Sequence, residues 1–213
     1  MQELAPGLWR WTARHGEWHP GEWGAEVASF AVDAGDAMLL VDPLLPEDDA
    51  AVLERLDALS PTAILVTIPY HARTAEPLAE RYDAPIHGHP AVAKRLRDNS
   101  RLQPLDDLPG GARAYPIGKP RRFETPVHLP SHRALVFGDA IVTTPEGDLR
   151  IWHGDRVDDE RARWYRDRFV PTLAPLRELD LERILVTHGE PILRDGSAAL
   201  EDALTARPWY HHG

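Results

Sequence analysis

The sequence predicts an α/β protein with two β-rich halves, each of which carries helices. Strand patterns dominate the first quarter, apolar strands alternate with helical segments in the middle, and strands return before a long helix and a final strand. The chain has 213 residues, of which 43% are hydrophobic, so it is long enough to bury the core of one sizeable domain. We therefore expect a single domain over residues 1–213.

The first half begins with strands and then alternates between helix and strand. The strands span residues 7–12, 26–32 and 37–42, with a turn at 33–36. Helical spacing of apolar residues, with acidic residues in the first turn, predicts a helix over 46–59. The expected continuation is a buried strand at 62–66, a helix from about 74 to 82, a strand at 84–87 and a helix from about 90 to 98. Such alternation predicts parallel neighbouring strands in this part.

The second half returns to strands after residue 112. They are expected over residues 113–117, 122–125, 133–137 and 140–143. A long helix begins near Glu160, and Pro171 or Pro175 is positioned to break it. The last strand covers residues 183–187 and is followed by His188.

Composition excludes several classes of function. The formal charge of −10 repels nucleic acid and anionic lipid, and no basic run offsets it. No window approaches the length of a membrane span and the N-terminus lacks a targeting pattern, so we expect a cytoplasmic, unprocessed protein. The absence of cysteine excludes disulfides and thiolate ligands, and any metal must be held by His, Asp or Glu. The 20 prolines suit a heat-adapted protein, although a GC-rich genome biases codons in the same way.

Polar motifs follow three of the expected strands. They are VHLPSH at 127–132, FGDA at 137–140 and VTHGE at 186–190. Each places a His or an Asp where a strand meets a loop, from which metal ligands and catalytic groups converge most easily at one edge of a sheet. Taken alone, a Gly-Asp or a His-Gly pair is more often a turn. Their order along the chain makes them informative.

That order, together with VDPLLP at 41–46 and TIPYHAR at 67–73, resembles the metallo-β-lactamase fold superfamily over nearly the whole chain. The family's pattern runs from an early Asp-Pro through a Thr-His-x-His-x-Asp-His loop and a Gly-His-Thr-Pro-Gly-His stretch to a Gly-Asp and a late Gly-His-Gly. The resemblance implies a four-layer αββα sandwich. It also implies a hydrolase built around two divalent ions that generate a hydroxide near neutral pH.

The resemblance further implies that much of this metal site is lost. With Thr67 on the motif threonine, the ligand or base positions of the loop carry different residues, namely Ile68, Tyr70, Ala72 and Arg73. Three later residues do match ligand positions, and by type they could hold one ion such as zinc or iron; they are His128, Asp139 and His188. We therefore expect no metal or a single divalent ion, and no dinuclear centre.

Three residues of the TIPYHAR loop are candidate functional groups. Arg73 stands at a ligand position, and we expect its guanidinium to replace the missing metal charge by pairing with Asp139. His71 falls between ligand positions, where it either packs against Tyr70 or is turned inward by a slip or bulge. Tyr70 either plugs the space of the lost ligands or donates its phenol to a substrate oxygen.

A Trp-rich loop over residues 13–24 is the other unusual stretch. Trp18, His19 and Trp23 lie in it, and large aromatic side chains are costly to expose, so we expect them to cover something. In the fold family the early hairpin loop overhangs the active-site groove, so one interpretation is an aromatic lid over a small-molecule pocket. The other is a loop that packs on its own core or on another subunit.

Three functions are open at this stage. The first is a divergent metallo-β-lactamase-fold protein that acts as an atypical hydrolase or a ligand-binding pseudoenzyme. The second is a hydrolase of an ester, lactone or thioester with one metal on His128, Asp139 and His188. The third is a homodimer that uses the Trp-rich loop as its contact, which size measurements on Trp18→Ala and Trp23→Ala would test. The substrate is set by loops rather than by the core motifs, so the sequence does not identify it.

Overall fold

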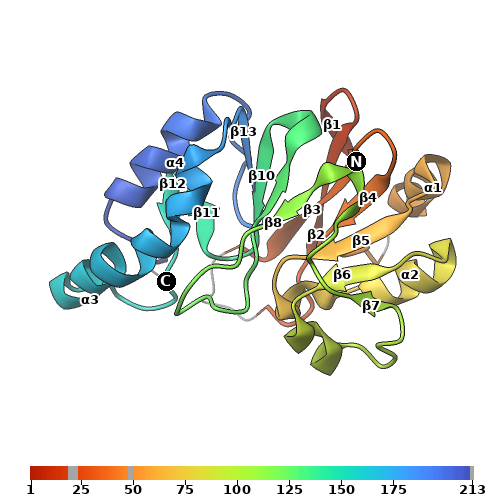
Figure 1. Cartoon of the computed structure of the whole chain (residues 1–213), viewed down its shortest axis with the longest axis horizontal. Coiled ribbons are helices and arrows are strands. Elements are labelled where there is room, and N and C mark those ends of the chain that lie inside the picture. Colours follow the sequence, from red (N-terminus) through yellow and green to blue (C-terminus); the bar gives the residue numbers. More distant parts are fainter. Residues whose placement is uncertain (19–23, 48–49, 212–213) are drawn as a thin grey trace.

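The computed structural model describes residues 1–18, 24–47 and 50–211. Within these residues the strands form two mixed sheets and a short hairpin (Figure 1). The first sheet has the order β1 (Gln2–Ala5), β2 (Leu8–Arg14), β3 (Glu26–Asp33), β4 (Met38–Val41), β5 (Ala63–Val66), β6 (Ile86–Gly88) and β7 (Leu102–Gln103). The second has the order β13 (Arg183–Val186), β10 (Ala134–Phe137), β9 (Val127–Leu129) and β8 (Arg113–Ala114). The hairpin pairs β11 (Ile141–Thr143) with β12 (Leu149–Ile151).

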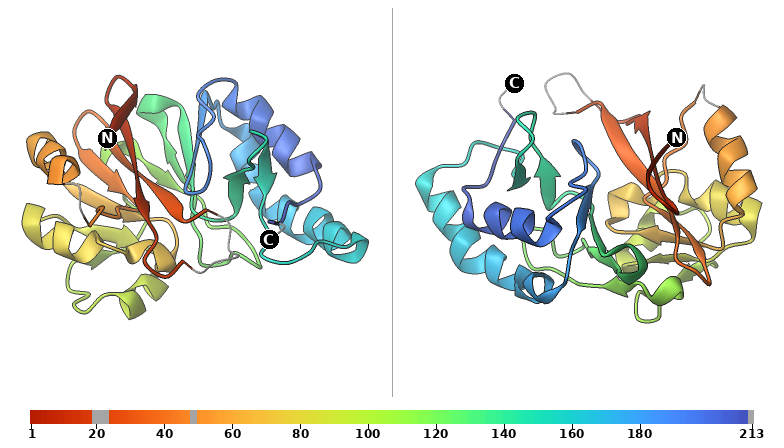
Figure 2. Two further views of the ribbon diagram at one scale, coloured as in Figure 1. Left: turned by 180° about the vertical axis from the view of Figure 1, so that it is seen from behind. Right: turned by 90° about the horizontal axis from the view of Figure 1, so that it is seen from above.

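Helices cover the outer side of each sheet (Figures 1 and 2). The first sheet carries α1 (Ala50–Leu59) and α2 (Ala75–Tyr82), and the second carries α3 (Asp159–Trp164) and α4 (Gly196–Thr205). The α3 helix continues through a π-helical turn, Tyr165–Phe169, into a 3₁₀ segment, Val170–Glu178. Shorter 3₁₀ turns are η1 (Pro69–Ala72), η2 (Pro90–Arg95), η3 (Pro109–Gly111) and η4 (Pro130–His132). The layers follow the order helix, sheet, sheet, helix, as the resemblance implies.

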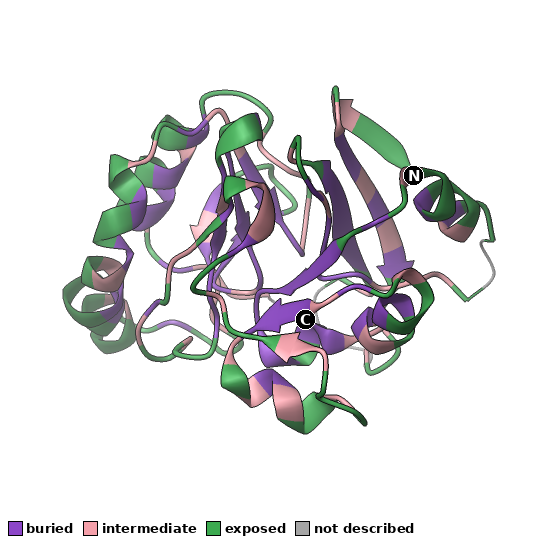
Figure 3. Ribbon diagram, turned by 45° about the vertical axis from the view of Figure 1, so that its right-hand side comes forward, coloured by how far each residue is buried: buried purple, intermediate pink, exposed green. Residues whose placement is uncertain are grey.

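Alternating side chains give the inner strands two apolar faces. On β10, Ala134 and Val136 pack toward the first sheet. Leu135 and Phe137, on the other face, pack against the helical layer formed by α4 and the segment after α3. Because successive side chains of a strand point to opposite faces, a continuous apolar run is the pattern of a strand buried on both sides. Figure 3 shows this arrangement, with buried residues concentrated in the strands and exposed residues on the outer helices.

Most of the predicted elements are confirmed. The four strands expected up to residue 66 are β2 to β5, and β4, β5 and β6 pair in parallel as the alternation predicts. The long helix continues past Pro171 and Pro175, but there it has 3₁₀ geometry, because each proline removes a backbone donor. No helix in the described part of the chain is long and apolar enough to cross a membrane.

Several elements differ from the prediction. The expected strand at 122–125 is a turn, in which the Glu124 N–H donates to the Arg121 carbonyl at 2.7 Å. The helix expected over 90–98 is shortened to η2, and β1, β12 and α4 carry patterns too short or too mixed to have been recognised.

Candidate functional site

The candidate site lies where strand ends from both sheets meet. Asp42 follows β4, Thr67 follows β5, Asp139 lies two residues beyond β10 and His188 lies two residues beyond β13. Both pairs, β4 with β5 and β10 with β13, are parallel, so within each pair the carboxyl ends lie at the same edge. Backbone hydrogen bonds join the two edges: the Ala28 N–H donates to the Thr187 carbonyl at 2.8 Å.

Asp42 is a buried carboxylate that organises the first edge. Its side chain accepts hydrogen bonds from the Thr67 N–H at 2.8 Å and from the Thr67 hydroxyl at 2.5 Å. The same carboxylate contacts the Nδ1 atom of His71 at 2.8 Å. Asp42 has a φ of 48°, an uncommon backbone conformation for a residue other than glycine, and such conformations concentrate at functional sites.

His71 bridges the two edges. Its ring is buried, with Nδ1 against Asp42 and Nε2 at 3.2 Å from Oδ1 of Asp139. Because both ring nitrogens face carboxylate oxygens, both must carry a proton for each contact to be a hydrogen bond, and the ring is then an imidazolium. Burial and the Arg73 charge each lower the pKa of His71, but the two carboxylates outweigh them and raise it above its ordinary value. The inward orientation left open by the sequence is therefore the one the structure adopts.

Arg73 places a second cation beside this bridge. Its Nη1 atom donates to the backbone carbonyl of Asp42 at 3.0 Å, and its Nε and Nη2 atoms are buried without a hydrogen-bond partner among the described residues. Burial lowers the pKa of Arg73, while the carboxylates of Asp42 and Asp139 raise it. The expected ion pair with Asp139 is not formed directly in the described part of the chain, because His71 occupies the position next to that carboxylate. Arg73 and Asp139 interact only through their charges.

Asp139 and His188 complete the group of ionisable side chains. Oδ1 of Asp139 lies 3.7 Å from Nε2 of His188. Burial alone would raise the pKa of Asp139, but the charge and contact of His71, and the charges of His188 and Arg121, lower it well below its usual range. Burial lowers the pKa of His188 to about 4 despite the attraction of Asp139. The second edge therefore carries a carboxylate and a neutral imidazole near pH 7.

Glu124 is a buried carboxyl group that the sequence analysis missed. Its Oε1 atom accepts hydrogen bonds from the N–H groups of Gly138 and Ala140, both at 3.0 Å, and its Oε2 atom has no partner among the described residues. Burial, together with the charge of Asp139, raises the pKa of Glu124 to about 7. A Cβ on Gly138 would lie 2.8 Å from the Thr67 hydroxyl oxygen, which explains why glycine precedes Asp139.

A sequence signal for Glu124 does exist. Residues 124–126 have the sequence Glu-Thr-Pro. The Gly-His-Thr-Pro-Gly-His stretch of the family contains His-Thr-Pro, which differs from it only in the first residue. In that register Glu124, and not His128, stands at the position of the first histidine. The burial of Glu124 beside Asp139 fits this register.

The structure brings only two of the three expected metal ligands together. Asp139 and His188 line one cavity, but His128 does not line it. His128 lies on β9, where it pairs with Leu135 on one side and Arg113 on the other. Burial and the Arg113 charge lower the pKa of His128.

The cavity over the site has a volume of about 360 Å³. It is lined by His15, Trp18, Gly24, Tyr70, His71, Arg73, Asp139, Trp152, Gly154, His188 and His211. Trp18 thus lies where an aromatic lid is expected, whereas His19 and Trp23 fall outside the described residues. The interpretation of Tyr70 as a plug is wrong, because 58% of this residue is exposed and Arg95 lies 4.5 Å above its ring.

The residues present do not match the metal centre that the fold family implies. Among the described residues, no group of three or more His, Cys, Asp or Glu is arranged to hold a metal ion. The nearest set is His71, Asp139 and His188, but both ring nitrogens of His71 already contact carboxylates. The buried Arg73 guanidinium lines the same cavity and adds a positive charge that opposes a divalent ion.

Comparison with known structures decides the fold. A metallo-β-lactamase from Pontibacter korlensis matches 97% of this chain and 98% of its own with a TM-score of 0.66 at 13% identity. A metallo-β-lactamase from Erythrobacter litoralis, crystallised with β-mercaptoethanol in its active site, matches 95% of this chain and 93% of its own with a TM-score of 0.65 at 18% identity. The chain has the metallo-β-lactamase fold.

Identities this low establish the fold and leave the chemistry open. A flavodiiron protein from Giardia intestinalis matches 95% of this chain and 58% of its own with a TM-score of 0.65 at 14% identity. Proteins described as lactamases and as flavodiiron proteins therefore share this metallo-β-lactamase fold, and the function must be argued from the site.

Sequence relatives are distant. No protein-family model matches the chain. A UPF0173 metal-dependent hydrolase of Methylacidiphilum infernorum (isolate V4) is 30% identical over 92 residues, which are 42% of this chain. The matched region covers 41% of that relative's length.

Proposed function

We propose that this protein is a small-molecule-binding member of the metallo-β-lactamase fold whose site holds fixed cations in place of metal ions. The observation that carries the proposal is the His71 ring, which contacts Asp42 at 2.8 Å and Asp139 at 3.2 Å. Asp139 is the carboxylate that the resemblance places at the metal ions, and Asp42 lies on the other side of the His71 ring. An imidazolium between them, with Arg73 beside it, neutralises the buried negative charge that a metal would otherwise neutralise.

The surroundings of the bridge support binding of a ligand. The cavity above it is large enough for a small molecule, and aromatic rings, Trp18 and Trp152, line it together with the charged groups. A fixed cation binds and orients an anionic or carbonyl oxygen, but it does not generate a hydroxide as a bound metal ion does. The site is therefore equipped to recognise a ligand, and we assign it no hydrolytic step.

A second candidate is a hydrolase of an ester, lactone or thioester that holds a single zinc or iron ion. It is favoured by the name of the distant relative, a metal-dependent hydrolase. For this function His71 would have to give up its contact with Asp139, because that carboxylate is the central ligand of any such set. Asp139 and His188 would then need a further ligand, and the histidines that line the same cavity are His15, His71 and His211.

Metal analysis separates the two candidates. We expect protein purified without chelator to contain well below about one equivalent of zinc or iron per chain, because the ligand set is already occupied by internal contacts. Addition of zinc or EDTA should leave the melting temperature unchanged, because a ligand that does not bind the native state does not stabilise it. Elemental analysis and thermal denaturation measure the two quantities.

The opposite result has a distinct signature. About one equivalent of metal per chain, lost in the Asp139→Asn variant and kept in the His128→Ala variant, would overturn the proposal and favour a mononuclear centre. His128→Ala is the matched control, because it also removes a potential ligand but lies outside the cavity.

A further inference from the structure

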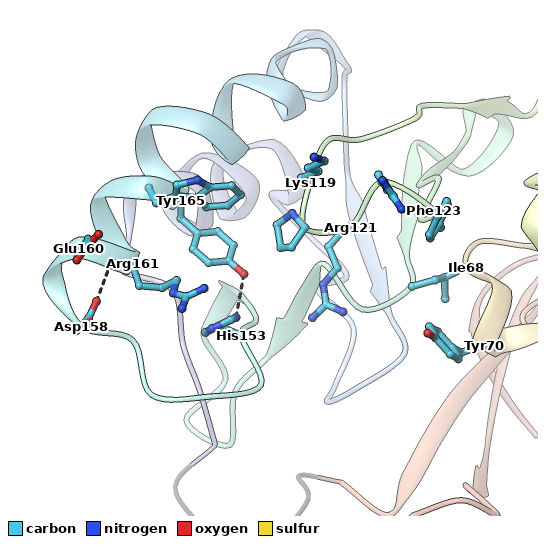
Figure 4. Close-up of a pocket in the computed structure, with 13 residues that line it drawn as sticks. Ile68, Tyr70, Lys119, Arg121, Phe123, His153, Asp158, Glu160, Arg161 and Tyr165 are labelled. Atoms are coloured by element: carbon cyan, nitrogen blue, oxygen red, sulfur yellow. Dashed lines mark hydrogen bonds between the residues drawn. The ribbon is translucent and has the colours of Figure 1, made fainter.

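A second, larger cavity adjoins the candidate site. Its volume is about 810 Å³, within the range of small-molecule pockets, and Tyr70 lines both cavities. Figure 4 shows its construction: Arg161 enters from α3 and Tyr165 from the π-helical turn that follows it. Ile68 and Tyr70 enter from the region of η1, and Arg121 lies between the two groups. The cavity thus lies between the two halves of the fold.

Cationic side chains that form no direct ion pair within the described residues gather around this cavity. They are Lys119, Arg121, Arg122 and Arg161, and none of them makes an ion pair in the described part of the chain. Other arginines of the molecule do pair, for example Arg81 with Asp57 and Arg207 with Asp159. The charges of Asp139 and Glu124 do act on Arg121, but without a direct ion pair. On a chain with a formal charge of −10, four cations that form no direct ion pair within the described residues favour an anionic ligand.

The carboxylates that line the cavity do not neutralise it. Asp158 and Glu160 also line it. Asp158, however, caps α3, where its Oδ1 atom accepts a hydrogen bond from the Arg161 N–H at 2.7 Å. Cations therefore outnumber anions around the cavity, and the Asp158 carboxylate already has a structural role.

Arg121 is the most firmly placed of these cations. Its Cζ atom lies 5.0 Å from the centre of the Trp152 ring, and its Nε atom is buried without a hydrogen-bond partner among the described residues. A guanidinium stacked on an aromatic ring is held in one orientation, and its planar donors suit carboxylate, sulfonate and phosphate oxygens. Trp152 also lines the smaller cavity, so an anion bound to Arg121 would lie next to the candidate site.

Exposed aromatic rings supply the other half of the surface. Tyr70, Phe123 and Trp164 are 58%, 40% and 39% exposed, and all three line this cavity. Within the described residues the other large apolar side chains with comparable exposure are Met1 and Leu193, which lie outside it. Rings that cost solvation when free gain contact with a flat apolar ligand.

We propose that this cavity binds a small molecule in which an anionic group, a carboxylate, sulfonate or phosphate, is joined to a flat apolar body. Arg121 and Arg122 contact the anionic group, and the exposed rings cover the apolar body. The inference rests on the proposed function in one respect, since it names the class of ligand that the protein binds. It does not depend on whether a metal ion is present in the smaller cavity.

Fluorescence titration with a matched pair of probes tests the proposal. Anilinonaphthalene sulfonate carries an anion on flat rings, and phenylnaphthylamine has similar rings without the charge. We expect the double variant Arg121→Gln/Arg122→Gln to bind the anionic probe at least about tenfold more weakly than the wild type, because charge-assisted hydrogen bonds are lost. Its affinity for the neutral probe should change less than about twofold, because the rings remain. The titrations use EDTA-treated protein, so that a failure of the metal-free proposal does not alter their outcome.

The matched control is Arg168→Gln/Arg194→Gln, which removes the same charge from exposed residues outside the cavity. This variant should keep the wild-type affinity for the anionic probe within about twofold, since remote exposed charges are screened by salt. Three results would overturn the proposal. They are the absence of saturable binding of the anionic probe, an equal loss of affinity for this probe in the cavity variant and the control variant, and a loss of affinity for the neutral probe in the cavity variant as large as that for the anionic probe. If the cavity variant does not fold, the salt dependence of wild-type binding tests the proposal instead. Affinity for the anionic probe should fall as the ionic strength rises, and an affinity that stays constant would contradict an ionic contact.

Discussion

The His71→Ala variant is expected to lose about 3–5 kcal/mol of unfolding free energy, the range observed when one partner of a buried ion pair is removed. The wild-type ring contacts carboxylates on both sides, Asp42 at 2.8 Å and Asp139 at 3.2 Å. Without it, the closest ionisable partner of Asp139 among the described residues is His188 at 3.7 Å, and the charge of Arg121 acts without a direct ion pair, so the burial of Asp139 is poorly offset. Urea denaturation of wild type and variant measures the loss.

A double-mutant cycle distinguishes loss of charge pairing from loss of packing. Asp139→Asn removes the charge that His71 faces, so the double variant His71→Ala/Asp139→Asn should be less destabilised than the sum of the two single variants. His87→Ala is the matched control, because that histidine is also buried but makes its contact with a neutral group, the Pro104 carbonyl at 3.1 Å. We expect this control to cost about 1–2 kcal/mol. Additive losses in the cycle would show that His71 acts through packing alone.

The fold could be predicted because its signals are local. The buried strand β5 is a continuous apolar run, and the Asp-Pro after β4 and the Gly-Asp after β10 mark strand ends by themselves. Parallel pairing of β4 with β5 and β6 follows from the alternation of strand and helix. The strand and the two strand-end motifs each occupy fewer than about ten consecutive residues, and the alternation is a succession of such short patterns.

The site was harder to predict, because its contacts depend on backbone geometry that the sequence does not display. His71 turns inward because η1 is a tight 3₁₀ turn that ends at Arg73, whose φ of 37° is rare for a residue with a side chain. A residue-by-residue match to the family loop assumes that this loop has the same backbone conformation as in the family. On that assumption His71 falls between the positions of the metal ligands and does not point into the site. The match predicts that Arg73 pairs with Asp139, whereas in the structure His71 makes this contact.

Glu124 illustrates a second limit. Residues 122–125 alternate polar and apolar side chains as an edge strand does, so the sequence assigns Glu124 to an ordinary strand position. In the structure the segment is a turn, and the carboxyl group is buried against the N–H groups of Gly138 and Ala140. The donors come from a loop fourteen and sixteen residues further along the chain, a contact that no local pattern encodes.

The Glu124→Gln variant is expected to be less sensitive to pH than the wild type. Burial raises the pKa of Glu124 from 4.5 to about 7 in the folded state. The folded protein therefore holds this proton more tightly than the unfolded chain does. The stabilisation that protonated Glu124 gives the folded state is fully present below the pKa of Glu124 in the unfolded chain, and it is lost as the pH rises through its pKa in the folded protein. Between these two values the wild type should lose about 3 kcal/mol relative to the variant, an order-of-magnitude figure from about 1.4 kcal/mol per pKa unit.

Glutamine keeps the acceptor for Gly138 and Ala140 but cannot ionise, so the difference between the two stability curves isolates the titration of Glu124. Both proteins retain His71 and His188, whose own titration cancels to first order in that difference. Urea denaturation at a series of pH values from about 4.5 to 8 measures it. Glu178→Gln, which removes an exposed carboxylate, controls for the change in net charge. Parallel curves for wild type and Glu124→Gln would contradict a protonated Glu124 in the folded state, because an already ionised carboxylate has no proton left to lose in this range.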